Sequence, residues 1–202
     1  MNGRRLLCAV AALTLAGCAK LTPPPPETVH TIAVFPAVNQ TGDPLLIAGG
    51  SILEKYVFDT ERFTVTDVLA AQARTLLEER GYVLVSPEAV AAATLGRSPA
   101  SAYQAAALAE EKHLPGMVLF IDLRRWVVAS PDSIIVSLRV DLIDPKTRTV
   151  VWNVDRQARP VSTQGTIDVP NAYNVAARRV MTDILESFRP PPGAGVTPTP
   201  AL

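Results

Sequence analysis

Three aspartates are the side chains of this sequence that are best placed to do chemistry together. Asp122, Asp141 and Asp155 each fall on one of three consecutive segments whose alternating apolar and polar residues predict neighbouring strands. Two or three converging carboxylates are the minimum for binding a hard metal ion or for acid/base catalysis. Because Arg124 and Arg139 are interleaved with them, structural ion pairs are the favoured interpretation. A hydrolase that uses the aspartates is the weaker hypothesis.

The sequence contains no other recognisable catalytic or cofactor motif. Its two histidines, His30 and His113, do not repeat at a metal-ligand spacing. His113 falls at the end of a predicted helix, where a positive charge is favourable. There is no GxSxG, no P-loop and no GxGxxG after a strand, and Gly49-Gly50 lacks the lysine that phosphate binding requires. We therefore expect no enzyme activity, no cofactor, no metal and no catalytic residue.

Each of the three predicted strands has an apolar face and a mixed polar face, because side chains alternate along a strand. The polar faces could form a solvated ladder of ion pairs, each worth about 0.2–1 kcal/mol. Alternatively they form a contact surface for another subunit, since arginine and tryptophan are enriched at interfaces. The candidate interface residues are Arg124, Arg125, Trp126 and Arg139. Strict alternation puts Phe120, Asp122, Arg124 and Trp126 opposite Leu119, Ile121 and Leu123, and it groups Val150, Trp152 and Val154 on the apolar face.

The amino-terminal segment and Cys18 indicate where in the cell the protein is located. Residues 1–17 contain two arginines, an apolar run and small residues, as in a secretory signal peptide. The apolar run is too short for a membrane-spanning helix, which needs roughly twenty residues, so a transmembrane anchor is the weaker alternative. Leu15-Ala16-Gly17-Cys18 resembles the lipobox of bacterial lipoproteins. The resemblance implies that the Cys18 sulfur receives a diacylglycerol and that the chain is cut before it; ordinary signal cleavage is the alternative.

A lipidated Cys18 has consequences for the fold and the location. Cys8 lies in the segment that would be removed, so no disulfide could form within the mature chain. The lipoprotein resemblance implies three acyl chains, palmitate among them, which would hold the protein permanently at a membrane. Ala19 follows the cysteine, and the absence of an aspartate there points to the outer membrane. We expect a protein that is lipid-anchored in the cell envelope and faces the periplasm.

The folded part is expected between two proline-rich ends. Residues 18–27 predict the lipidated cysteine and an extended stalk, residues 28–189 a single domain, and residues 190–202 a disordered proline-rich tail. Nineteen basic side chains balance nineteen acidic ones. This balance removes the electrostatic basis for binding nucleic acid or for polybasic attachment to anionic lipid.

The first half of the domain alternates between predicted strands and helices. Residues 30–36 and 82–86 have the apolar, β-branched pattern of short strands. Helical periodicity covers residues 66–80, with Gly81 as the stop. Ser86-Pro87 predicts the start of a helix to Leu95, and Ser98-Pro99 the start of another that ends near His113.

The second half predicts an antiparallel meander followed by a helix. Residues 117–130, 133–144 and 149–159 are long strands joined by short turns. Residues 171–188 have apolar side chains at helical spacing. The predicted fold class is α/β (α+β): one domain with a mixed β-sheet, a C-terminal antiparallel meander and helices packed on the sheet.

The order of these segments resembles the GNA-like family of small bacterial lipoproteins. The most specific pieces are "RGYVLVSPEAV" and "DLIDPKTRTVVW", whereas the stretch after Asp43 does not match. The family is similar in fold to the amino-terminal domain of TolB and to the periplasmic part of the curli-secretion lipoprotein. The resemblance implies a non-enzymatic accessory or assembly component of an export or transport system, with other envelope proteins as partners and a tendency to form oligomers. It supplies no catalytic residues.

A periplasmic module that binds a small ligand or glycan is the alternative function. Such a module needs a concave pocket lined by aromatic side chains. The candidate positions are the loop from Thr41 to Ser51, or Trp126 and Trp152.

Overall fold

A computed structural model describes residues 31–47, 64–163 and 169–188 of the chain. The predicted signal peptide, Cys18, the stalk and the tail lie outside the described residues, and so does part of the loop from Thr41 to Ser51. Among the described residues, no helix is both long enough and apolar enough to cross a membrane.

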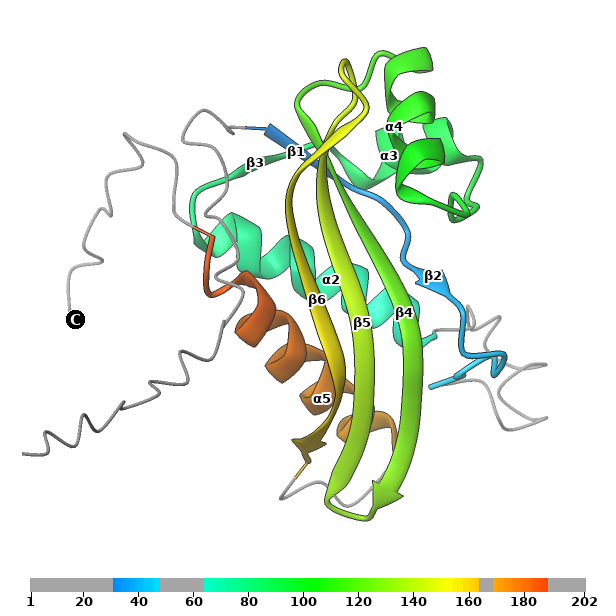
Figure 1. Cartoon of the computed structure of the whole chain (residues 1–202), viewed down its shortest axis with the longest axis vertical. Coiled ribbons are helices and arrows are strands. Elements are labelled where there is room, and N and C mark those ends of the chain that lie inside the picture. The colour runs from blue at the N-terminus through cyan, green and yellow to red at the C-terminus, as the bar shows by residue number, and fades with distance from the viewer. Residues whose placement is uncertain (1–30, 48–63, 164–168, 189–202) are drawn as a thin grey trace, which may run out of the picture.

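The described strands form one mixed, open sheet (Figure 1). Its order is β3-β1-β4-β5-β6, and the short β2 also pairs with β4. β1 is parallel to both β3 and β4, whereas β4, β5 and β6 are joined as an antiparallel meander. This arrangement confirms the predicted fold class. The strands are β1 (Thr31–Val34), β2 (Val38–Asn39), β3 (Val83–Leu84), β4 (Met117–Ser130), β5 (Ser133–Asp144) and β6 (Thr149–Ser162).

Local capping signals set the starts of the helices. Thr64 and Asp67 form a capping box at the start of α2, and the Ser86 side chain caps α3, with proline at the first helical position. The predicted start of the next helix at Ser98-Pro99 is wrong, because the Ser101 side chain is the cap of α4. Ser98 Oγ instead donates to the Ala37 carbonyl at 2.9 Å, which ties this loop to the segment after β1. The helices are α2 (Val65–Glu79), α3 (Pro87–Thr94), α4 (Ala102–Glu111) and α5 (Val169–Leu185).

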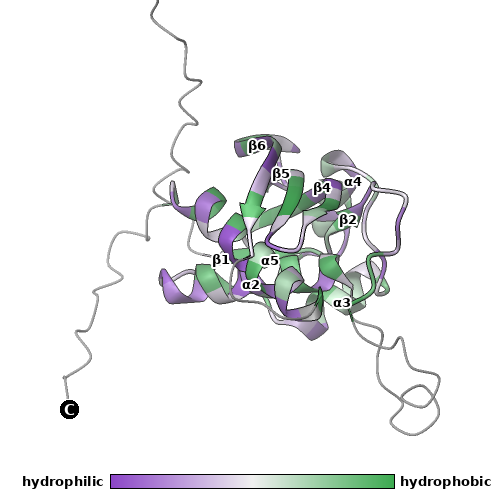
Figure 2. Ribbon diagram, turned by 90° about the horizontal axis from the view of Figure 1, so that it is seen from below, coloured by the Kyte–Doolittle hydropathy of each residue, from purple (hydrophilic) through white to green (hydrophobic). Residues whose placement is uncertain are grey.

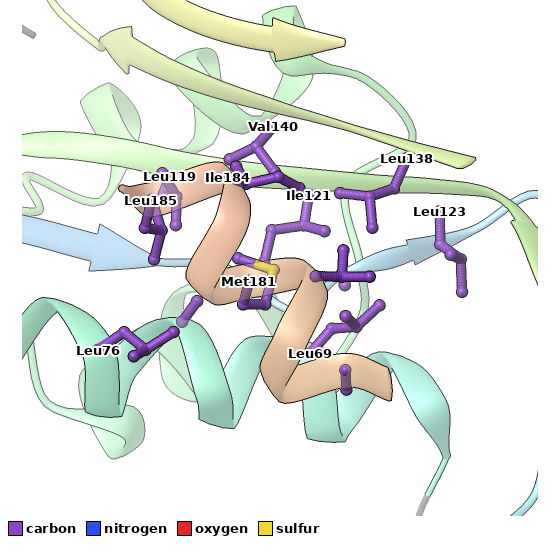
Figure 3. Close-up of a cluster of buried hydrophobic side chains, with 14 of the residues drawn as sticks. Leu69, Leu76, Leu119, Ile121, Leu123, Leu138, Val140, Met181, Ile184 and Leu185 are labelled. Carbon is purple, nitrogen blue, oxygen red and sulfur yellow. The ribbon is translucent and has the colours of Figure 1, made fainter. Parts of the chain in front are cut away.

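The main core lies between one face of the sheet and the helix pair α2 and α5. The two helices lie together on that side of the long strands (Figures 1 and 2). Leucines and isoleucines of β4 and β5 contact Leu69 of α2 and Met181 of α5, and all of these side chains are buried (Figure 3). The predicted apolar row of β5 belongs to this core: Ile134, Val136, Leu138, Val140 and Leu142.

The opposite face of the sheet is covered only in part by described helices. A smaller core under α3 and α4 contains Phe35, Val118, Phe120 and Ile143, together with alanines of α4. This core occupies the end of the meander nearest β1. Further along the strands, the same face carries polar and charged side chains.

Register shifts in the meander break the strict alternation that the sequence predicts, and two of them change the predicted faces. The register of β4 against β5 shifts between Leu123 and Arg125. As a result Trp126 turns into the main core, where it is only 4% exposed and packs edge-on against Tyr173. Placing Trp126 on the polar face is therefore wrong. A second shift, between Leu142 and Ile143, separates Val150 from buried Trp152 and leaves Val150 39% exposed, so its grouping with the core was wrong too.

Candidate functional site

The charged side chains of the second face lie in a row across the meander. In the sheet register, Asp122 of β4 is opposite Arg139 of β5, which is opposite Asp155 of β6. Asp141 lies two residues further along β5 and points to the same face. The structure thus brings together the three aspartates that the sequence singled out, and it places arginines between them. We call this surface the arginine face, and it consists of Asp122, Arg124, Arg125, Arg139, Asp141 and Asp155.

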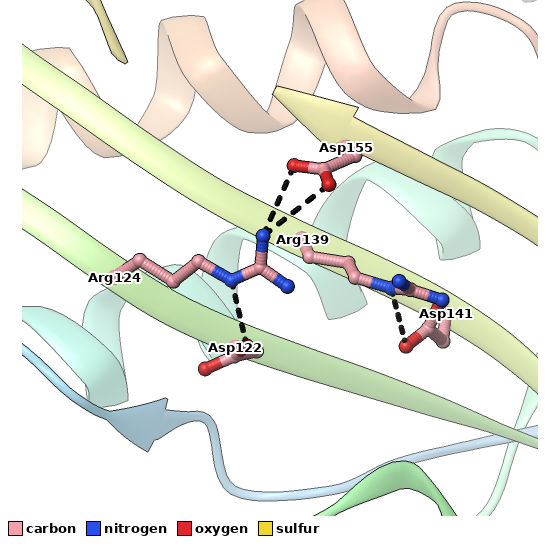
Figure 4. A network of polar contacts seen from close by, with 5 residues as sticks. All are labelled: Asp122, Arg124, Arg139, Asp141 and Asp155. Atoms are coloured by element: carbon pink, nitrogen blue, oxygen red, sulfur yellow. Dashed lines mark hydrogen bonds and ion pairs between the residues drawn. The ribbon is translucent and has the colours of Figure 1, made fainter. Parts of the chain in front are cut away.

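Arg124 joins the two outer strands of the meander by reaching over β5 (Figure 4). Its Nε donates to Asp122 Oδ2 at 3.0 Å, and its Nη1 donates to the two carboxylate oxygens of Asp155 at 3.2 and 3.3 Å. The hydrogen bond to Asp122 is the main reason why the pKa of Arg124 is raised. The bulge aims Arg124 in this direction, because it adds a residue between Leu123 and Arg125.

A second ion pair lies beside the first and within one strand. Arg139 Nε donates to both oxygens of Asp141, at 2.8 and 3.0 Å. Burial raises the pKa of Asp141 above its ordinary value, although the hydrogen bond from Arg139 and the charge of Arg124 oppose this effect. Desolvation therefore disfavours the charged form of Asp141 more strongly than the two arginines favour it.

The two kinds of charge lie at different depths. The side chains of Asp122 and Asp141 are 11% and 4% exposed, whereas those of Arg124 and Arg139 are 36% and 35% exposed. Asp122 Oδ1 is buried and has no hydrogen-bond partner among the described residues. Within the described part of the chain, Arg124 Nη2 and both Nη atoms of Arg139 also have no partner. Guanidinium donors thus form the outer layer of this surface, over carboxylates that orient them.

The predicted interface residues do not all lie on this surface. Arg124, Arg125 and Arg139 do, and Arg125 is exposed with no ion pair to any described residue. Trp126 is buried on the other side of the sheet. Trp152 is buried too, at 1% exposure, so neither tryptophan lines the open pocket that the ligand-binding alternative requires.

The chemistry available to the aspartates follows from their partners. Each carboxylate already accepts a hydrogen bond from an arginine, so a metal ion or a substrate would compete with a guanidinium for these side chains. The described residues include no group of three or more histidine, cysteine, aspartate or glutamate side chains that could hold a metal ion. His113 is exposed at the C-terminal end of α4, as predicted.

No family model matches the chain, and no curated protein matches it by sequence. Solved structures with a similar fold include the PelC dodecamer from Paraburkholderia phytofirmans, at 14% identity, covering 82% of this chain and 93% of that one, with a TM-score of 0.49. Lipoprotein GNA1162 from Neisseria meningitidis is 16% identical, and the match covers 76% of this chain and 96% of that one, with a TM-score of 0.47. The LpoB C-terminal domain from Salmonella enterica is 18% identical, and the match covers 66% of this chain and 84% of that one, with a TM-score of 0.37. GNA1162 bears the name of the family that the sequence resembles.

Sequence reasoning missed the bulge, although the sequence carries a signal for it. Arg124 and Arg125 are adjacent charges in a strand that otherwise alternates. In a regular strand one of them would point into the apolar core, and an extra residue at this point lets both avoid it. The exposed Val127, at 44%, was also missed as a neighbour of the arginine face.

Proposed function

We propose that this protein is a lipid-anchored component of the bacterial cell envelope that works by binding other envelope proteins and not by catalysis. Its anchor is the lipidated Cys18, in the outer membrane and facing the periplasm. Its folded domain is an accessory or assembly component of an export or transport system, alone or as an oligomer. The location and the kind of system are supported by the lipobox and the GNA-like segments of the sequence.

The observation that carries the binding function is the layered arrangement of the arginine face. Buried Asp122 and Asp141 hold Arg124 and Arg139 in place, and the guanidinium donors that have no described partner belong to the more exposed side chains. Such donors are oriented before a partner arrives, so binding costs less conformational entropy. Arginine is also enriched where protein interfaces have their largest contributions to affinity. The pairing of the carboxylates with arginine supports binding over acid/base catalysis.

The anchor is tested by mass spectrometry of the mature amino-terminal peptide and by membrane fractionation. We expect a mature chain that begins at Cys18 and carries diacylglycerol, and a Cys18→Ser variant that leaves the membrane fraction. A mature chain that starts elsewhere, or that carries no fatty acid, contradicts this part of the proposal.

The binding function is tested with the lipidated protein extracted in detergent. We expect it to co-purify with another envelope protein or to form an oligomer, and we expect Arg139→Glu to weaken this association while far-ultraviolet circular dichroism shows an intact fold. Arg178→Glu is the matched control, because Arg178 is an exposed arginine on α5, on the other side of the sheet. A lone monomer at every concentration, or equal effects of both variants, contradicts the proposal.

A further inference from the structure

The outer edge of β4 loses its neighbouring strands halfway along. β1 pairs with the start of β4, and β2 pairs with Asp122 and Leu123. The last contact is a hydrogen bond from Gln40 N to the Leu123 carbonyl, at 2.8 Å. From Arg124 to Ser130 no described strand lies on this edge, whereas β5 continues on the inner edge as far as the hairpin turn. An open strand edge presents backbone donors and acceptors to any chain that can extend along it.

The side chains along this open edge are of two kinds. Arg124 and Arg125 lie at its start, and both are exposed. The guanidinium of Arg124 reaches over β5 to Asp155, whereas Arg125 has no ion pair to a described residue. Val127 and Val128 follow, 44% and 51% exposed, and they point to opposite faces of the sheet. The edge therefore combines positive charge on the side of the arginine face with apolar surface on both sides.

These features together favour one kind of occupant. Only a polypeptide can continue the hydrogen-bond ladder of a sheet, which a polysaccharide or a lipid headgroup cannot do. In an added strand, alternate side chains point to opposite faces. Acidic residues at alternate positions would therefore lie on the same face as Arg125, and the apolar residues between them would lie on the face of Val128.

We propose that the edge of β4 from Arg124 to Ser130 binds an extended segment of another envelope protein in which acidic and apolar residues alternate. The segment adds a strand to the sheet, with a carboxylate at Arg125. This inference rests on the proposed function, and it names the chemistry of the partner.

The test uses the lipidated full chain in detergent and fluorescently labelled peptides of about seven residues. One peptide alternates glutamate with valine, a second has lysine in place of glutamate, and a third has a central proline in the glutamate peptide. By fluorescence anisotropy we expect the glutamate peptide to bind about tenfold or more tightly than the lysine peptide, because charge pairing contributes at this scale. The proline peptide should bind weakly, because proline lacks the N–H that the ladder needs.

Two variants locate the binding. Arg125→Glu should weaken binding of the glutamate peptide about tenfold and should strengthen binding of the lysine peptide. Because Arg125 has no described ion pair, this change should leave folding intact, which far-ultraviolet circular dichroism checks. Arg178→Glu should change neither affinity.

Several results would overturn the inference. These are equal affinity for the glutamate and lysine peptides, no effect of Arg125→Glu, or binding to vesicles that contain phosphatidylglycerol without binding to the peptide. A doubled mass by light scattering that Arg125→Glu abolishes would instead assign the edge to a second copy of this chain. If the peptide fails while Arg139→Glu still disrupts co-purification, the proposed function stands and only the strand-addition mode is wrong.

Discussion

At the residue scale, Arg124 compensates a carboxylate that has little contact with water. Asp122 as a whole residue is 8% exposed, and Arg124 is its described ion-pair partner, with 3.0 Å between Arg124 Nε and Asp122 Oδ2. Removing one member of a buried pair is costly because the other charge stays buried, whereas replacing both members by apolar residues can be neutral. The pair therefore orients the arginine face without necessarily stabilising the fold.

We predict that Arg124→Met lowers the free energy of unfolding by about 1–3 kcal/mol, because it leaves a buried, charged acceptor without its donor. The double variant Asp122→Leu and Arg124→Met should recover most of this loss. Urea denaturation monitored by circular dichroism measures both. Arg125→Ala is the control, and it should stay within about 0.5 kcal/mol of the native protein. Additive losses in the double variant would contradict this account of the pair.

Asp141 should make stability depend on pH in a defined direction. Burial raises the folded-state pKa of Asp141 above its reference value of 3.8. The stabilising contribution of its protonated form is therefore complete below that reference value, and it is lost as the pH rises through the raised folded-state pKa. Asp122, Arg124 and Arg139 are the charged groups that face it.

We predict that Asp141→Asn becomes progressively more stable relative to the native protein as the pH rises from about 4 to 7. The gain cannot exceed about 1.4 kcal/mol per pH unit for one proton. Asparagine keeps an oxygen that can accept the hydrogen bond from Arg139. Urea unfolding of both proteins across this range measures the difference. A difference that is constant with pH would show that Asp141 does not titrate as the structure implies.

At the element scale, the bulge in β4 lets one strand place residues in the main core on both sides of two adjacent arginines. Before the bulge, alternate residues such as Ile121 enter the main core, and after it Trp126 does so. Between them, Arg124 and Arg125 occupy the place of a single residue opposite Ser137. One extra residue thus allows two adjacent arginines on the polar side without burying either charge.

We predict that deletion of Arg125 leaves the fold intact, because Arg124 can take its place in the register and Trp126 stays in the core. Deletion of Ile121, in the regular part of β4, should unfold the protein, because a one-residue slip moves the neighbouring side chains to the wrong face. Tryptophan fluorescence reports the difference: the emission of the first variant should stay blue-shifted. A red-shifted emission of the Arg125 deletion would show that the bulge is essential for the register.

At the scale of the whole molecule, aromatic packing closes the main core where the described chain ends. The Phe188 ring contacts Trp152 of β6 at a centroid distance of 4.2 Å and Tyr82, just before β3, at 5.8 Å. Phe188 is 4% exposed. It therefore links the end of α5 to both halves of the sheet.

We predict that Phe188→Ala lowers the free energy of unfolding by about 3–5 kcal/mol, as expected for a buried phenylalanine that leaves a cavity. Phe188→Leu, which keeps most of the apolar volume, should cost much less. Thermal and urea denaturation measure both. Similar losses for the two variants would indicate that ring geometry, and not filled volume, dominates at this position.

Short-range patterns in the sequence were enough to predict the strands of the meander, the cap of α3 at Ser86 and the mixed α/β class. These features depend on residues close together in the chain, whose spacing and hydrogen bonding are local. The start of α4 was wrongly predicted at Ser98-Pro99, because Ser98 Oγ donates to the carbonyl of distant Ala37 and Ser101 is the cap. The three aspartates and their arginines were found as candidates by alternation alone.

The depth of each charge and the position of Trp126 depended on how β4, β5 and β6 pair with one another. The bulge exists only when β4 is matched against β5, so strict alternation placed Trp126 on the wrong face. Burial of Asp122 and Asp141, and the reach of Arg124 to Asp155, require the three strands of the meander at once. Such properties come from long-range packing, which a local pattern of residues does not encode.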